Sequence, residues 1–298
     1  MWMFEGATTA WPRSGGTVWS MALDIATSEP ATTTPDPSGK PRRRLRVPLG
    51  WIVPVAVLVL WWAAYHAQWV NPVLFSSPWE VTRTLWAAIL DGSFGTNLVA
   101  SLTRWLLGFG IGAVLGLLFG ALTGLSRTAE RLLDPTFQML RTIPIMGLVP
   151  LFIVWFGLGE LPKVLLIAIA AYFLVYIQMY AGIRNIDRKL IEVGRMYELS
   201  TAQMLRRIII PAAMPSILQG IRLGLGVAWL ALVIAELTGA NVGIGFWMQQ
   251  GREFVRVDIV LAALIVFAAI GKIVDSLVRL LESRLLSWRD NVEREMGA

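Results

Sequence analysis

The sequence contains no cysteine and a single histidine, His66. Zinc, haem and iron–sulfur centres depend on cysteine and histidine ligands, and thiol or serine–histidine catalysis needs the same side chains. The sequence also lacks the G-x-x-x-x-G-K-[ST] loop that cradles nucleotide phosphates. We therefore expect no metal site, no cofactor and no catalytic residues, and any energy source would belong to another protein.

Charged residues are scarce as well, at 15% of the chain, whereas hydrophobic residues make up 56%. Soluble domains carry about 25% charged residues, so this chain has too few polar groups for an aqueous surface. Apolar runs able to cross about 30 Å of hydrocarbon lie at 49–65, 106–125, 143–158, 164–180, 217–237 and 257–280. The sequence predicts an all-α integral membrane protein with six transmembrane helices. Pro144 and Pro150 interrupt the third, which is the shortest.

Basic residues are unevenly distributed among the predicted loops. Six spans place both termini on one side of the membrane, and that side holds most of the 26 Lys and Arg residues. Positive charge is retained on the cytoplasmic face, so we expect a multi-pass protein of the cytoplasmic membrane with both termini cytoplasmic. The net charge of +6 then reflects topology and gives no reason to expect nucleic-acid binding.

The chain divides into three parts. Residues 1–48 include a stretch rich in Pro, Thr and Asp at 28–38 and a basic run at 40–46, which predicts a disordered cytoplasmic tail with a basic anchor. The sequence near Met1 has no apolar core of the kind found in a cleavable signal peptide, so we expect no such signal. Met21 is an alternative start residue. Residues 49–288 form the predicted transmembrane domain, and 289–298 form a cytoplasmic C-terminal tail.

Glycine recurs at every fourth position of the second predicted span. The five positions are Gly108, Gly112, Gly116, Gly120 and Gly124. They form a stripe on one helix where another backbone can approach closely. The stripe predicts either tight packing within one chain or a sliding surface for a moving partner helix.

Ionisable residues at membrane depth are costly and suggest a transport pathway. Arg141 precedes the proline break of the third span, and Arg222 and Glu236 lie in the fifth. Arg222 and Glu236 are separated by about 21 Å of helix, so each needs a partner on another helix, a water-filled cavity or an interfacial position. Lys272 and Asp275 have the i,i+3 spacing that allows them to neutralise each other.

A long polar segment, 184–215, separates two apolar runs. Its charge pattern predicts two short helices, the second capped by Ser200 and Gln203 at S-x-x-Q spacing. Pro211 and Pro215 are expected to close it. A simple connection would need only a few residues, so the segment is predicted to bind another protein.

The residues Glu192-Val193-Gly194, position 198 and Ile208-x-Ile210-Pro211 resemble the E-A-A-x-x-x-G-x9-I-x-L-P loop of ABC importer membrane subunits. Two flanking blocks, 182–188 and 241–245, are most similar to aliphatic sulfonate permeases within the nitrate, taurine and sulfonate group. The resemblance covers about 51–288.

That resemblance implies a type I (MetI-like) importer fold with a cytoplasmic coupling helix. It also implies a second permease copy, forming a homodimer, two ATP-binding subunits and an extracytoplasmic substrate-binding protein. The residues implied in coupling are Glu192, Val193, Gly194, Tyr197, Glu198, Leu199, Ser200 and Pro211. Nitrate, taurine or another small anion is the alternative cargo. A secondary transporter is disfavoured because the second half shows no matching broken span, and a membrane-embedded enzyme because no set of catalytic groups converges.

Two positions depart from the family pattern. Gly194 stands where the second alanine is usual, and Glu198 replaces the glycine. A glycine there suits a left-handed turn, which other residues adopt at a cost of about 1 kcal/mol or more. Either the turn is remodelled or the strain is accepted. For Glu192, the alternative to a coupling contact is a solvated helix-face glutamate.

Overall fold

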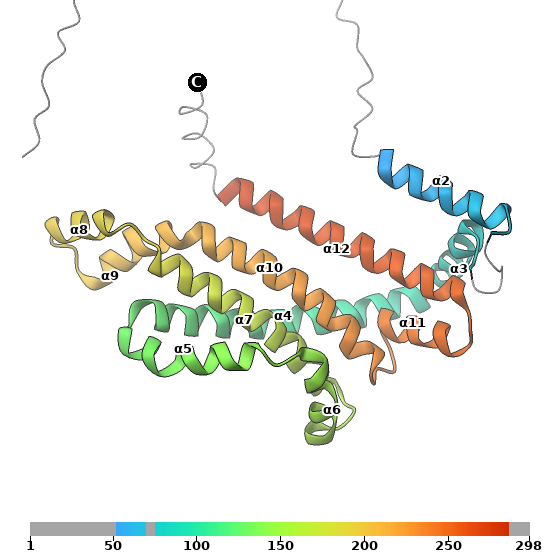
Figure 1. Cartoon of the computed structure of the whole chain (residues 1–298), viewed down its shortest axis with the longest axis horizontal. Coiled ribbons are helices and arrows are strands. Elements are labelled where there is room, and N and C mark those ends of the chain that lie inside the picture. The colour runs from blue at the N-terminus through green and yellow to red at the C-terminus, as the bar shows by residue number, and fades with distance from the viewer. Residues whose placement is uncertain (1–51, 70–74, 286–298) are drawn as a thin grey trace, which may run out of the picture. The chain divides into compact units, whose positions relative to one another are not determined.

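The computed structural model describes residues 52–69 and 75–285, and the regular structure in these residues is helical (Figure 1). The elements are α2 (Ile52–His66), α3 (Pro78–Leu90), α4 (Ser93–Leu125), α5 (Arg127–Arg141), α6 (Ile145–Phe156), α7 (Glu160–Arg184), α8 (Arg188–Met196), α9 (Thr201–Met204), a π-helical turn η2 (Leu205–Ile209), α10 (Ile210–Leu237), α11 (Ile244–Glu253) and α12 (Val257–Leu285). The predicted tails 1–48 and 289–298 lie outside the described residues.

Four helical stretches of the described chain are long and apolar enough to cross a membrane: α4, α7, α12 and the run from α9 to α10. The predicted third span, 143–158, appears as α6, which has only 12 residues and meets α5 at an angle of 97° around the Pro144 break. Counting that pair as one span gives five. The predicted first span appears as α2, an apolar helix of 15 residues, so six full spans are not confirmed.

Helix α4 begins at Ser93, well before the predicted start at 106. The apolar run on which the prediction rests begins only after Arg104. In the structure Arg104 is buried and paired with Glu160 and Glu236. A neutralised arginine can remain inside a membrane helix, which explains the longer span.

Three helices, α3, α5 and α11, were not predicted. A capping box starts α3, since the Glu80 backbone N–H donates to the Ser77 hydroxyl at 3.1 Å and the Ser77 N–H donates to the Glu80 carboxylate at 2.9 Å. Pro78 occupies the first turn, where no backbone donor is needed. Helix α11 packs on α12 and buries Ile244 and Trp247.

The interior forms where α4, α7 and α10 pack together (Figure 1). All five stripe glycines of α4 face α7. A Cβ at Gly116 would lie 2.8 Å from the Tyr172 carbonyl oxygen, and one at Gly112 would overlap the Ala168 carbonyl. The glycines thus permit backbone contact between two helices of the same chain, which confirms the prediction of tight packing within the chain.

Candidate functional site

The 184–215 segment forms the predicted pair of short helices, α8 and α9. The Asp187 carboxylate accepts from the Lys189 N–H at 2.9 Å and starts α8. Ser200 and Gln203 form a reciprocal capping box at the start of α9, with distances of 3.3 Å and 2.9 Å. The helix–turn–helix prediction is confirmed.

The turn between them resolves the alternatives at Glu198. Its φ is 52°, so this non-glycine residue adopts the left-handed conformation. The Glu198 N–H donates to the Arg195 carbonyl at 2.9 Å and the Leu199 N–H donates to the Gly194 carbonyl at 3.1 Å. These two bonds are the Schellman arrangement that closes a helix end. The turn is therefore kept and the strain at Glu198 is accepted.

Gly194 is buried where α8 meets the next turn of chain. A Cβ there would lie 2.7 Å from the Met204 sulfur and 2.6 Å from the end of the Ile208 side chain. The long Met204 and Ile208 side chains fill the space that an alanine methyl would occupy. This packing gives a physical reason for glycine at that position.

An apolar patch is exposed on α8 and its turn: Leu190, Val193, Met196 and Tyr197. Met196 is 82% exposed and Tyr197 77% exposed. Glu192 is exposed on the same helix. An exposed apolar surface of this kind, outside the long apolar helices, is typical of a site that contacts a protein or a membrane. The sequence analysis named Val193 and Tyr197 but missed Leu190 and Met196. Leu190, Met196 and Tyr197 each lie three or four residues from Val193, a helical spacing that could have indicated a shared face.

The second short helix runs directly into a long helix. Chain 201–237 is one apolar helical stretch in which η2 joins α9 to α10. Pro211 lies in the first turn of α10 and Pro215 in its interior, so the expectation that these prolines close the segment was wrong. Proline needs no backbone donor in a first turn, and the helix continues.

The other end of the segment is fixed to α5. The Arg184 guanidinium is paired with Glu130, and Tyr180 donates to the same carboxylate at 2.5 Å. One turn further into the span, Tyr176 donates to Asp134 at 2.7 Å. Side-chain bonds therefore hold α7 and α5 together at the end where the segment begins.

Arg222, a predicted pathway residue, is neutralised by α12. It binds Asp275 at 2.9 Å and approaches Glu282 at 3.5 Å. Asp275 also pairs with Arg279 at 2.9 Å. In the part of the chain that the structure describes, no Lys272–Asp275 pair forms, so that expectation was wrong. The sequence could not show that Asp275 faces α10.

Glu236, a second predicted pathway residue, is 1% exposed. Its carboxylate accepts from Ser101 at 2.8 Å, from Arg104 at 2.6 Å and from the Gly245 N–H at 2.8 Å. Arg104 also binds Glu160. Glu236, on α10, thus bonds directly to α4 and to the start of α11 and is linked to α7 through Arg104; its role in a pathway stays a prediction.

Arg141, the third predicted pathway residue, lies in a different environment. It ends α5 at the break before α6 and lines a largely apolar cavity of about 600 Å³. Among the described residues no hydrogen bond or ion pair reaches its guanidinium. The structure therefore separates Arg141 from Arg222 and Glu236 and does not bring the three together.

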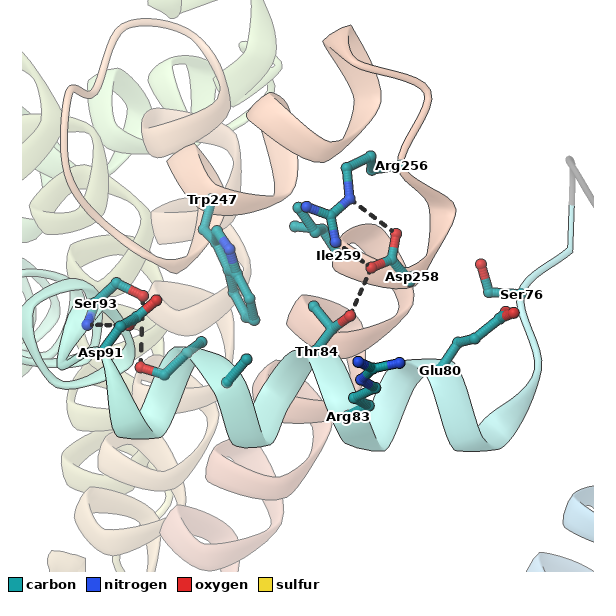
Figure 2. A pocket seen from close by; sticks show the side chains of 12 residues that line it. Ser76, Glu80, Arg83, Thr84, Asp91, Ser93, Trp247, Arg256, Asp258 and Ile259 are labelled. Atoms are coloured by element: carbon teal, nitrogen blue, oxygen red, sulfur yellow. Dashed lines mark hydrogen bonds and ion pairs between the residues drawn. The ribbon is translucent and has the colours of Figure 1, made fainter.

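A second cavity, of about 500 Å³, lies between α3 and the α11–α12 turn (Figure 2). Asp258 accepts from Arg256 at 2.6 Å and from the Thr84 hydroxyl at 2.6 Å. Hydrogen bonds from Ser93 lower the pKa of Asp91 below its usual value. Arg83 is drawn in Figure 2 without an interaction to any neighbour shown.

Comparison with known proteins identifies the family. Residues 112–287 match the model of the binding-protein-dependent transport system inner membrane component. The chain belongs to this family. It is also 43% identical, over 92% of its length and 99% of the relative, to the putative aliphatic sulfonates transport permease protein SsuC of Bacillus subtilis (strain 168).

Another relative of this transport component is the taurine transport system permease protein TauC of Escherichia coli (strain K12). The identity is 35%, over 80% of this chain and 88% of the relative. Among solved structures, an amino acid ABC transporter matches with a TM-score of 0.58 and 21% identity, covering 67% of this chain and 97% of that chain. The predicted type I importer permease fold is confirmed. The transport component is a multi-pass inner membrane protein and not an enzyme.

Proposed function

We propose that the chain is the membrane-spanning permease subunit of an ATP-driven importer of aliphatic sulfonates. The cargo is supported by the 43% identity to a putative aliphatic sulfonates permease over nearly the whole of both chains. The observation that carries the coupling role is the exposed patch around Met196 and Tyr197 on a helix pair that follows α7 after a short turn and runs into α10. The 184–215 segment is the coupling element and faces the cytoplasm with both termini.

The partners follow from that role. Two separate ATP-binding subunits hydrolyse ATP, a second copy of the chain completes the pathway as a homodimer, and an extracytoplasmic binding protein delivers the sulfonate. Glu192 and the patch contact an ATP-binding subunit, with Gly194, Glu198, Leu199 and Ser200 shaping the turn. Pro211 lies where that turn joins α10.

The mechanism is mechanical. ATP binding draws the two ATP-binding subunits together and displaces α8 and α9 with them. Helices α7 and α10 follow as one body, because a Cβ at Gly182 would lie 2.7 Å from the Ser216 Cβ and one at Gly220 would lie 2.8 Å from the Gln178 Cβ. Packed elements in such contact move as units and do not deform continuously. Helix α5 follows α7 through Glu130 and Asp134.

The deciding experiment reconstitutes the full-length chain with its ATP-binding subunit and binding protein in liposomes. We expect ATP-dependent uptake of an alkanesulfonate and stimulation of ATP hydrolysis by the loaded binding protein. Uptake of nitrate or taurine alone would keep the permease role and replace the cargo. Uptake driven by an ion gradient without ATP would refute the proposal.

Glu192→Lys tests the coupling contact in the same liposomes. Reversing one exposed charge at an interface opposes association, so we expect stimulated ATP hydrolysis to fall about tenfold. Glu192→Gln removes the charge without reversing it and serves as the graded control. Equal stimulation in all three proteins would assign Glu192 to a solvated helix face.

A further inference from the structure

The cavity at the break between α5 and α6 is lined by residues of α5, α6, α7 and α10. Its volume of about 600 Å³ lies within the range of small-molecule sites. Its walls are apolar and aromatic, including Leu148, Phe152 and Trp155 of α6 and Phe173 of α7. A polar solute without an apolar part gains nothing from such walls.

Among the described residues that line this cavity, Arg141 is the one that carries a charge. Arg104, Arg184 and Arg222 each bind a carboxylate, whereas within residues 52–69 and 75–285 no carboxylate contacts Arg141. The Arg141 side chain is exposed and has no carboxylate partner in the described chain, so its positive charge is available to a ligand that enters the cavity. The cavity therefore favours an anion.

Two further groups in the wall support an anion. The Tyr172 hydroxyl is buried and has no hydrogen-bond partner among the described residues, and Tyr172 lines the cavity. Helix α6 starts at the cavity as well: Ile145 in its first turn lines the wall, and its N-cap, Pro144, offers no side-chain cap. The positive end of a helix dipole favours negative charge.

We infer that this cavity is a transport subsite for short-chain alkanesulfonates. The sulfonate group lies at Arg141 and the alkyl chain lies along Leu148, Phe152 and Trp155. The inference rests on the proposed function and adds selection by the permease itself. Because each methylene transferred from water to an apolar wall strengthens binding about fourfold, the subsite prefers hexanesulfonate to butanesulfonate, and a bare anion such as nitrate binds weakly.

The test uses the complex of the full-length chain with its ATP-binding subunits in lipid nanodiscs, without the binding protein. Equilibrium dialysis of labelled butane- and hexanesulfonate measures binding, with empty nanodiscs subtracted. We expect the wild type to bind hexanesulfonate about tenfold more tightly than butanesulfonate, and Arg141→Gln to weaken both at least tenfold. Arg141→Lys keeps the charge and should retain most of the affinity. Leu148→Trp narrows the apolar wall and should reduce the difference between the two chain lengths.

The matched control is Arg83→Gln. Arg83 is another exposed arginine without an ion pair in the described chain, but it lines the cavity between α3 and the α11–α12 turn. Its substitution should leave sulfonate binding unchanged. Binding that is equal in Arg141→Gln and the wild type, or that ignores chain length, would assign the cavity to lipid or to the second copy and overturn the subsite.

The two proposals fail separately. If liposomes show ATP-driven sulfonate uptake while dialysis shows no Arg141-dependent binding, the subsite is wrong and the importer stands. If uptake is absent and dialysis still shows binding lost in Arg141→Gln, the importer function is wrong, and the cavity is a sulfonate-binding site with no role in ATP-driven uptake.

Discussion

The interior formed by α4, α7 and α10 and the 184–215 segment use their side chains in opposite ways. In the interior, glycine contacts bring backbones together, and the carboxylate of Glu236 is fully hydrogen-bonded. In the segment, caps and a Schellman turn fix the backbone, yet Met196 and Tyr197 face away from the chain. Side chains of the interior make their contacts within the chain. The segment has an ordered backbone but leaves the Met196 and Tyr197 side chains exposed.

This difference separates stability from function. Substitutions in the interior should lower the free energy of unfolding. Substitutions on the exposed patch should leave unfolding unchanged and reduce coupling. The following variants test that separation.

Arg104→Met should have the largest effect. It leaves the Glu236 carboxylate, 1% exposed, without a cation among its described partners. Removing one partner of a buried ion pair costs about 3–5 kcal/mol. Unfolding of the purified chain in mixed micelles with increasing SDS measures the loss.

The controls for Arg104→Met are Glu160→Gln and the double variant Arg104→Met/Glu236→Gln. The Glu160 side chain is 60% exposed, so its loss should cost about 1 kcal/mol or less. The double variant removes both buried charges and should recover much of the stability. A single Arg104→Met variant as stable as the wild type would show that the cluster contributes nothing to the closed interior.

Gly112→Ala should have the next largest effect. Its methyl group would overlap the carbonyl of Ala168, which is backbone and cannot move aside alone. Overpacking of this kind costs about 1–3 kcal/mol. Gly110→Ala on the same helix is the matched control, since nothing lies within 4 Å of its Cβ position, and its stability should stay equal or rise. Equal SDS unfolding of both variants would contradict close α4–α7 contact.

Met196→Ser combined with Tyr197→Ser tests the exposed patch of the 184–215 segment. Both side chains are exposed, so unfolding should change by about 0.5 kcal/mol or less. Loss of an apolar anchor at a partner surface should nevertheless lower stimulated ATP hydrolysis about tenfold. Thr201→Ala, also exposed in the segment, is the control and should keep full stimulation. A double variant with normal coupling would remove the patch from the contact.

The sequence predicted what depends on local pattern. The glycine stripe and the Ser200 cap follow from residue spacing along one helix, and the four long spans follow from the length of apolar runs. All are present. The sequence could not predict pairings between distant helices. The partners of Arg104 lie 56 and 132 residues away, so the sequence did not show that the span includes this arginine.

Some misses were avoidable. Ser77-Pro78 followed by Glu80 is a capping box with a first-turn proline, so α3 could have been predicted from its start signal. The candidate site also has one part that the sequence predicted and one that it could not. The turn at Glu198 was anticipated from the motif, whereas the cavity around Arg141 depends on how α6 folds back after Pro144.

Glu198→Gly should have the smallest effect and acts on the segment alone. Glu198 has a φ of 52°, a conformation that costs a side chain about 1 kcal/mol and glycine almost nothing. Relief of that strain opposes the added freedom of glycine in the unfolded chain, so we expect a gain of at most about 1 kcal/mol. Arg195→Gly is the matched control, because Arg195 is helical in α8 and glycine there should cost about 1 kcal/mol. Hydrogen exchange of the α8 and α9 amides reports both changes. Slower exchange in Glu198→Gly with unchanged exchange in α4 would show that the strain is local, and faster exchange in Glu198→Gly would show that the glutamate stabilises the turn.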